Sequence, residues 1–241
     1  MRVTPFFFCD SLPGGRKEKV ASARLSFFDT IEERDGTLFL FSLKESSLFH
    51  LDALRTMIMY RKYYRKPNLN WFKFKALTAA HSYPRRVRII SVGKGKDYNI
   101  FPMDLLGNIA QQHRFIFGLR HSNRSLPEII GQGKLVVSEA SPEHKTVIYQ
   151  LGKHHLSNPP LPEKLPFGII ESENYGFYVP DWVDNYKEVT IKKAIDLGSH
   201  MLLWGTWDKE KIFRPETAHL YHIHFLQYLH QKRKGINYQI V

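Results

Sequence analysis

Basic and hydroxyl-bearing side chains follow one apolar segment of the chain, and together they could hold an anion. The segment FIFGL, residues 115–119, reads as a strand and runs directly into RHSNRS. Guanidinium groups offer planar forks of donors that match a phosphate, and successive turn amides can form an anion-binding nest. The same residue types also make ordinary turns, so both interpretations stay open. The candidate donors are Arg120, Ser122, Asn123, Arg124 and Ser125.

A second predicted strand, YNIFPMDL at residues 98–105, lies just before this segment and follows a turn rich in glycine and lysine. If the two strands bring their ends together, their amides, hydroxyls and guanidinium groups could surround one phosphate. Gly93 and Gly95 give only a G-x-G pattern, with no third glycine and no capped helix after it. A dinucleotide-binding Rossmann fingerprint is therefore not supported.

Composition indicates a folded, β-rich protein in a reducing compartment. The chain has 241 residues, of which 43% are hydrophobic and 14% aromatic. Cys9 is the only cysteine, so neither a disulfide within the chain nor a C-x-x-C metal site is possible. The apolar stretch near the start is too short for a signal peptide, and no run is long enough to span a bilayer. We expect a cytoplasmic protein with no membrane partner.

The positive charge is concentrated in one part of the chain. The net charge is +12, and the stretch from Ala53 to Lys96 holds twelve lysine and arginine residues with no aspartate or glutamate. Such a field attracts anions, whether nucleotide cofactors or nucleic acid. Within it, WFKFKAL at residues 71–77 alternates aromatic and basic residues and predicts a half-buried strand. Aromatics between basic residues can grip single-stranded nucleic acid, but Phe72 and Phe74 would share one face and fit a core better.

The order of segments predicts an N-terminal appendage followed by a β-rich core. Over residues 1–80 we expect antiparallel strands, a hairpin turn at Asp35-Gly36, and one helix from Leu48 to Tyr64 capped by Ser46 or Ser47. From about residue 81 the chain supplies short strands, with one helix starting after Ser141 and no long helices between strands. This pattern disfavours a parallel α/β sheet and favours a closed antiparallel barrel.

The core resembles the flavin reductase-like, FMN-binding split-barrel family. The matching segments run from Ser82 onward and are YPRRVRIISVGKGKDYN, IFPMDLLG, FIFGLRHSNRS and IDLGSHMLLWGTW. The resemblance implies a mainly β fold: an antiparallel, Greek-key split β-barrel with a few short helices over 81–241, carrying an N-terminal α+β appendage over 1–80. The first 80 residues have no counterpart in the minimal family.

The resemblance also assigns residues to a site. The stretch that would approach the isoalloxazine ring and ribityl tail of FMN is formed by Asn99, Phe101, Pro102, Met103 and Asp104. The phosphate would lie on the loop from Arg120 to Ser125, and His200 would be the catalytic residue near the flavin or the nicotinamide. Two departures are evident: Ser199 replaces the family's usual aspartate, and HSNRS departs from its Ser-Arg-Thr order.

The implied function is an FMN-dependent oxidoreductase that transfers hydride between NADH or NADPH and bound flavin. It would be a homodimer with flavin at the subunit interface, serving a small-molecule electron acceptor. Hydride transfer is the cofactors' own chemistry, which agrees with the absence of a triad or metal cluster in the sequence. Two alternatives stay open: a flavin-binding protein without reductase activity, and a nucleic-acid-binding module using residues 53–96, which we favour least.

Four histidines outside these motifs are candidates for other roles. His222 and His224 share one face of a predicted strand, but two histidines fall short of a zinc set, so we expect no metal site. His154 and His155 precede a proline-rich loop and are predicted to form a solvated turn. Asp104 could either polarise a flavin or cap a turn, and both interpretations stay open.

Overall fold

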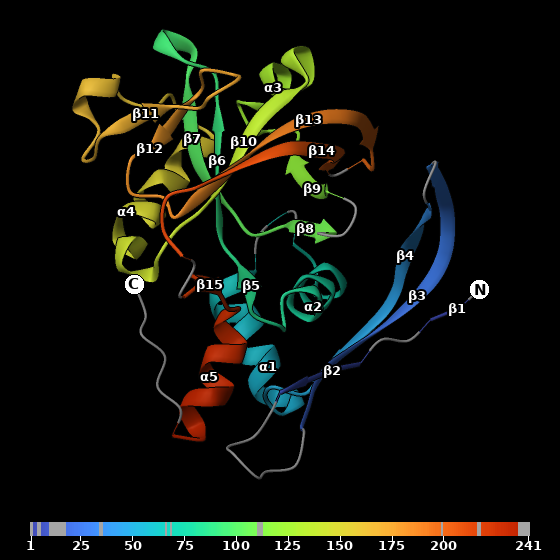
Figure 1. The fold of residues 1–241 in the computed structure, drawn as a ribbon. Coiled ribbons are helices and arrows are strands. Elements are labelled where there is room, and N and C mark those ends of the chain that lie inside the picture. Colours follow the sequence, from blue (N-terminus) through green and yellow to red (C-terminus); the bar gives the residue numbers. More distant parts are fainter. Residues whose placement is uncertain are drawn as a thin grey trace. The chain divides into compact units, whose positions relative to one another are not determined.

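The structure is a computed structural model that describes residues 2–3, 6–9, 18–33, 36–65, 67, 69–109, 113–198, 200–215 and 218–235. The chain forms two units, drawn in Figure 1, and each is described by itself. The first comprises Met1–Pro84 and Ile223–Ile240, and the second comprises Arg85–His222. The units divide at Pro84, and the C-terminal helix groups with the first. The division into domains at residues 80 and 81 stays a prediction.

The second unit is built on a seven-stranded antiparallel sheet. The order is β7-β6-β10-β13-β14-β9-β8. Only Asp104 and Leu105 separate the two edge strands, β7 and β8, in the chain, so the sheet must curve round until its edges approach each other. Among the described residues, no ladder joins those two edges, so the barrel is split. The strands are β6 (Arg88–Val92), β7 (Asn99–Met103), β8 (Leu106–Ile109), β9 (Arg114–Arg120), β10 (Lys134–Glu139), β13 (Asn185–Asp196) and β14 (His200–Ile212).

Strand β6 shows why the segment RIISV is almost continuously apolar. Successive side chains of a strand point to opposite faces. Ile90 and Val92 therefore join a core inside the barrel with Phe101 and Phe117, whereas Ile89 joins a second core on the other face. Both faces of this strand are buried, and all five of its residues are enclosed. The predicted fold class, mainly β with an antiparallel split barrel and a few short helices, is confirmed.

Short helices and two-stranded sheets complete this unit. The helix predicted after Ser141 is present, beginning as a 3-10 turn in which the Glu143 amide donates to the Ser141 hydroxyl at 3.4 Å. Helix α3 ends at Gly133, whose φ of 64° favours glycine. The elements are α3 (Leu126–Gln132), η4 (Pro142–His144), α4 (Lys145–Gln150), η5 (Leu151–His155), η6 (Pro162–Lys164), β11 (Ile169–Glu171) paired with β12 (Tyr178–Pro180), and β5 (Arg85–Arg86) paired with β15 (Tyr221–His222).

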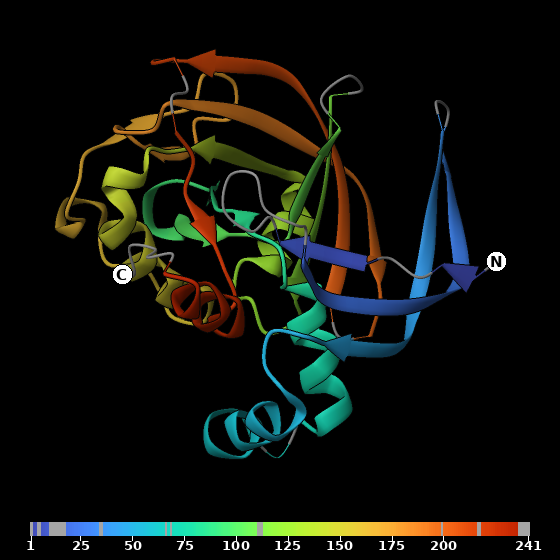
Figure 2. The same ribbon diagram turned by 90° about the horizontal axis from the view of Figure 1, so that it is seen from below.

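The first unit contains a four-stranded antiparallel sheet centred on β3 (Glu18–Glu33), which pairs with β1 (Arg2–Val3), β2 (Phe6–Cys9) and β4 (Gly36–Leu48). Figure 2 shows the long hairpin of β3 and β4 in blue. The predicted strands here are confirmed, and Glu33 lies opposite Gly36 at the hairpin end. Asp35 itself, which the turn prediction invoked, lies outside the described residues.

The start and the cap of the helix predicted in this unit need correction. The helix expected from Leu48 begins later, as α1 (Ala53–Met59) continued by a π-helical turn, η1 (Tyr60–Tyr64). Its cap is Asp52, whose carboxylate accepts from the Arg55 amide at 2.8 Å, while Ser46 and Ser47 belong to β4. The hairpin strand simply continues past the serines, because its partner β3 is long enough to pair with them.

The strand predicted at WFKFKAL is wrong, because these residues open helix α2 (Trp71–Ala80). Asn70 caps the helix by accepting from the Lys73 amide at 2.9 Å. Phe74 is fully buried beside Leu51 and Leu226, whereas Phe72 is 45% exposed. Residues 72 and 74 therefore do not share a buried face. The strand on which the nucleic-acid-binding interpretation depended is a helix instead. The last helix is α5 (Phe225–Arg233). Among the described residues, no helix is long and apolar enough to cross a membrane.

Candidate functional site

The two segments that the sequence singled out meet in the barrel. Asn99 begins β7 and is almost fully buried, and its side-chain amide donates to the Ser125 hydroxyl at 2.7 Å. The same amide donates to the backbone oxygen of His154 at 2.9 Å. The stretch from Asn99 to Asp104 therefore begins directly beside the loop from Arg120 to Ser125.

Within that loop, buried and exposed residues have different roles. Asn123 is buried, and its amide oxygen accepts from the Ser125 backbone amide at 2.9 Å, which fixes the turn. Ser125 is also buried and bound to Asn99. The remaining three predicted phosphate residues, Arg120, Ser122 and Arg124, are exposed. These three side chains are the ones from which an incoming anion could accept hydrogen bonds.

His154 and His155 link the loop to β7, so the prediction of a solvated turn is wrong. His154 is 1% exposed, and its Nδ1 donates to the Ile100 carbonyl at 2.8 Å. His155 donates from Nε2 to the Pro102 carbonyl at 2.8 Å. At its other nitrogen, Nδ1, it accepts from the Asn123 amide at 2.9 Å. Burial lowers the pKa of both histidines, which favours neutral rings. For His155, the hydrogen bond accepted at Nδ1 requires the neutral form.

A sequence signal for this link existed in the spacing. Ile148, Leu151 and His154 recur every three residues and are all buried along α4 and η5. Reading the histidines together with that apolar row would have placed His154 on the buried face of a helical segment. The neighbouring proline-rich loop obscured the pattern.

The stretch expected to line a ring system divides into enclosed and accessible side chains. Phe101 is fully buried in the barrel core, where its ring lies 4.8 Å from that of His155, and Met103 is 6% exposed. Pro102 and Asp104 are half-buried. The side chain of Phe101 is therefore unavailable to a ligand, whereas Pro102, Met103 and Asp104 line a cavity.

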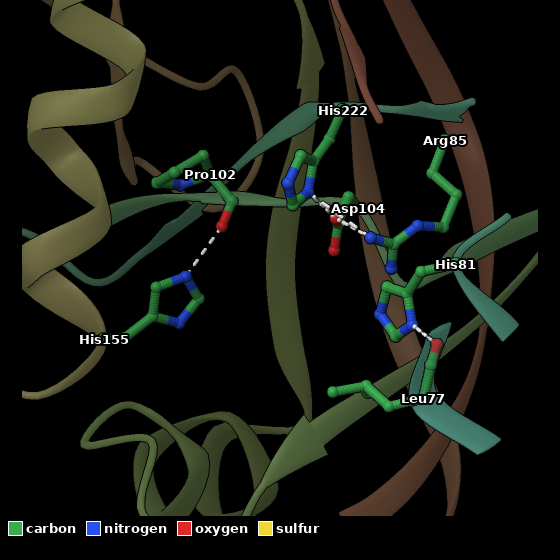
Figure 3. A network of polar contacts seen from close by, with 7 residues as sticks. All are labelled: Leu77, His81, Arg85, Pro102, Asp104, His155 and His222. Atoms are coloured by element: carbon green, nitrogen blue, oxygen red, sulfur yellow. Dashed lines mark hydrogen bonds and ion pairs between the residues drawn. The ribbon is translucent and has the colours of Figure 1, made fainter. Parts of the chain in front are cut away.

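That cavity has a volume of about 200 Å³. Its polar corner is Asp104, whose Oδ2 lies 2.8 Å from Nη2 of Arg85 and 2.5 Å from Nδ1 of His222. Figure 3 shows the Asp104 carboxylate between these two side chains, with Pro102 and His155 on the far side of the space. Asp104 thus takes part in an ion pair, which neither of its expected roles included. The cavity is lined by Val87, Pro102, Met103, Asp104, Ile148, Tyr149, His155 and His222.

His200 lies beside the loop at the start of β14. Its backbone pairs with that of Arg120 on β9, so the predicted catalytic residue neighbours a predicted phosphate residue. Burial lowers the pKa of His200, and the charges of Arg120 and His121 lower it further. The imidazole is therefore neutral at neutral pH. Ser199, one of the two departures from the family pattern, lies outside the described residues.

Part of the basic stretch is neutralised within the barrel. Arg88 binds Glu139 at 2.6 Å, Arg86 binds the other oxygen of that carboxylate at 2.9 Å, and Arg85 binds Asp104. Both carboxylates come from outside the stretch of residues 53–96. Outside the barrel, Arg55 of the same stretch lies 3.2 Å from Asp52. The field of the stretch is therefore weaker than the bare sequence suggests, because several of its cations have carboxylate partners.

Comparisons with known proteins identify the fold. No family model and no curated protein sequence matches this chain. Solved structures do. BorF, the flavin reductase component of a bacterial two-component tryptophan halogenase, has a TM-score of 0.54 at 13% identity, over 61% of this chain and 91% of its own. An FMN-binding protein from Thermus thermophilus has a TM-score of 0.52 at 14% identity, over 61% and 85%.

A third similar structure is the NADH:FAD oxidoreductase SgcE6 of Streptomyces globisporus, solved in complex with NAD and FAD fragments. It has a TM-score of 0.52 at 12% identity, over 63% of this chain and 88% of its own. At sequence identities this low, the structural similarity shows that the fold is shared and nothing finer. The resemblance found in the sequence is thereby confirmed at that level: the chain has a flavin reductase-like fold.

Proposed function

We propose that the barrel binds FMN, with the phosphate on Arg120, Ser122 and Arg124 and the ring system along the stretch from Asn99 to Asp104. The observation that carries this proposal is the 2.7 Å hydrogen bond between Asn99 and Ser125. It joins the stretch assigned to the ring to the loop assigned to the phosphate. The fold shared with flavin reductases and an FMN-binding protein supports the choice of a flavin.

The residues present fit the chemistry of this cofactor. Two guanidinium groups and a hydroxyl are exposed on one turn and can donate to a phosphate. Behind them, Oδ1 of Asn99 and Nε2 of His154 are buried acceptors without a hydrogen-bond partner among the described residues. Such acceptors need a donor, which a hydroxyl of the ribityl tail or a bridging water would supply.

Bound flavin would supply the redox chemistry by accepting hydride from NADH or NADPH. The chain's own residues hold and orient the partners. Neutral His200, next to Arg120, would offer a hydrogen bond to the cofactors without adding a charge. We place this activity in the cytoplasm, with a small molecule as the final electron acceptor.

We also propose a homodimer in which a second copy completes the site. The cavity of about 200 Å³ is smaller than the 300 to 1,000 Å³ typical of cofactor sites. A flavin therefore needs more enclosing surface than this cavity provides, and twofold dimers are the commonest assembly. Size-exclusion chromatography with light scattering should give twice the chain mass, and a monomer that binds FMN tightly would refute this part.

The function itself is tested by titrating the purified full chain with FMN while following the quenching of flavin fluorescence. NADH or NADPH is then added without oxygen, and the visible absorbance of the oxidised flavin should bleach. An absence of quenching would overturn the proposal. Quenching without bleaching would leave the alternative, a flavin-binding protein that lacks reductase activity of its own.

A further inference from the structure

Helix α1 of the first unit is apolar on both of its faces. On the inner face, Met59 packs against the core that contains the buried Phe74. On the outer face, Leu54, Met57 and Ile58 recur at the spacing that aligns side chains on one side of a helix. All three are exposed, Leu54 by 63% and Ile58 by 51%. A surface helix normally presents polar side chains on its outer face, so this face fits an apolar partner.

Basic side chains continue the outer face of α1 into η1. Arg61 lies one turn after the apolar row, Lys62 and Arg65 follow it, and all three are exposed. They belong to the acid-free stretch that carries the excess charge of the chain. Arg55, at the start of the helix, lies 3.2 Å from Asp52 and is compensated. The partner therefore has to meet exposed apolar side chains and a positive field together.

An aromatic contact joins this face to α5. The exposed ring of Tyr63 lies 6.5 Å from that of Phe225, which is also exposed. Lys232 and Arg233, at the far end of α5, are exposed as well, and residues 217–241 contain no aspartate or glutamate. Aromatic rings and cations at the edge of an apolar face are typical of helices that lie in the headgroup region of a bilayer.

An anionic lipid surface accommodates all of these features. Aliphatic side chains enter the boundary between headgroups and acyl chains, and cations meet the negative headgroups. A single-stranded nucleic acid would instead stack its bases on flat rings and would leave the exposed aliphatic row without a partner. The rings of Tyr63 and Phe225 are inclined by 68°, so they form no flat platform for stacked bases. The side chains present favour lipid over nucleic acid.

We propose that the outer face of α1 and η1, together with the start of α5, binds the surface of an anionic membrane without crossing it. This goes beyond the proposed function, because it concerns the first unit and uses no residue assigned to the flavin. It also replaces the expectation of no membrane partner. That expectation rested on the length of apolar runs, and a helix that lies in the interface needs no run long enough to span a bilayer.

Vesicles test the proposal. The full chain is mixed with vesicles of phosphatidylcholine, either alone or with about one third phosphatidylserine, and the bound fraction is measured by co-sedimentation. Partitioning should be at least tenfold stronger on the anionic vesicles. It should fall severalfold when the salt is raised from about 0.1 to 0.5 M, because salt screens the attraction. Equal binding to both kinds of vesicle, or binding to neither, would overturn the proposal.

Apolar variants locate the contact. The double variant Leu54→Ser, Ile58→Ser should weaken binding to the anionic vesicles at least tenfold, because two side chains no longer leave water. Both are exposed, so its melting curve should match that of the wild type. Leu156→Ser with Ile212→Ser is the matched control, since these two barrel residues are at least as exposed, and it should change binding less than twofold. Equal effects of the two double variants would contradict the assignment.

Charge variants make an independent test. Arg61→Gln with Lys62→Gln should weaken binding to the anionic vesicles at least fivefold, because each cation near a negative surface adds to the attraction. Lys192→Gln with Lys209→Gln removes two exposed cations from the barrel and should change binding less than twofold. Loss of binding in the second pair alone would place the contact on the barrel and overturn the proposal.

Two further measurements identify any other occupant of this face. Light scattering should show the same oligomeric state for the wild type and for Leu54→Ser, Ile58→Ser; a change to monomer would make the face an interface between copies and overturn the proposal. An oligothymidylate that binds more tightly than the anionic vesicles would overturn it in favour of nucleic acid. FMN titration of each variant should match the wild type, so failure of the flavin proposal leaves this one standing, and the reverse.

Discussion

Asn123 donates a hydrogen bond to Nδ1 of His155 at 2.9 Å and thereby ties the loop after β9 to the helical segment that supports β7. The other nitrogen of the same imidazole binds the Pro102 carbonyl. One neutral ring thus fixes the distance between the exposed cations of the loop and the stretch that lines the cavity. The geometry of the candidate site depends on this connection as much as on the exposed residues.

Replacing Asn123 by Ala should therefore destabilise the barrel by about 2 kcal/mol, because it leaves the Ser125 amide and the His155 ring unpaired in a buried place. Urea denaturation followed by tryptophan fluorescence measures the change. Ser122→Ala, one residue away and exposed, is the matched control and should stay within about 0.5 kcal/mol of wild type. Equal effects of the two substitutions would contradict the buried role of Asn123.

The double variant Ser122→Ala, Arg124→Ala should weaken FMN binding without lowering stability. Each charge-assisted hydrogen bond to a phosphate contributes roughly 1.5 to 3 kcal/mol, so we expect the Kd to rise at least tenfold. Fluorescence quenching gives the Kd, and a melting curve checks the fold. Lys192→Ala removes another exposed cation from the barrel, on β13, and should change the Kd less than threefold. An unchanged Kd in the double variant would exclude this loop as the phosphate site.

The barrel could be predicted from the sequence because its strands are bounded by clear turns and its motifs keep a fixed order. The same order predicts that Asn99 lies near Ser125, since both segments occupy set positions in the related fold. What the order could not supply was the connection through His154 and His155. A hydrogen bond between residues 123 and 155 depends on the docking of a helical segment, which local patterns do not encode.

The polar corner of the cavity was missed for a similar reason. Arg85, Asp104 and His222 are far apart in the chain and converge only when β5 pairs with β15. His222 was considered only with His224, two residues away. In the structure, His222 hydrogen-bonds to Asp104 instead, and the His224 ring stacks 5.9 Å from that of Tyr64.

The error at WFKFKAL came from a short pattern that fits both periods. In a strand, Trp71 and Phe74 would point to opposite faces, whereas in a helix they lie three residues apart on the same face. A segment of seven residues fits both patterns, and tertiary packing decides between them. The cap by Asn70 and the helix-favouring end of the segment tip the balance toward a helix. The nucleic-acid interpretation lost its main support with that strand.

The helix at this position makes its own prediction. Phe74→Ala should destabilise the first unit by about 3 to 5 kcal/mol, because the side chain is fully buried against Leu51 and Leu226. Phe72→Ala should cost less than about 1 kcal/mol, since Phe72 is 45% exposed. Denaturation followed by circular dichroism compares the two. A strand with both phenylalanines on its buried face would instead give similar losses.

The first unit should lose stability in mild acid because of His50. Burial, with the nearby His230, lowers the pKa of His50 to about 4, against 6.5 in the unfolded chain. Between these values the unfolded state binds more protons than the folded state, so the stabilising contribution is complete above pH 6.5 and declines as the pH falls toward 4. The loss should reach roughly 3 kcal/mol. Urea denaturation at a series of pH values should show this slope, His50→Phe should flatten it, and His121→Phe, on an exposed ring, should keep it. A slope that persists in His50→Phe would show that another group binds the protons.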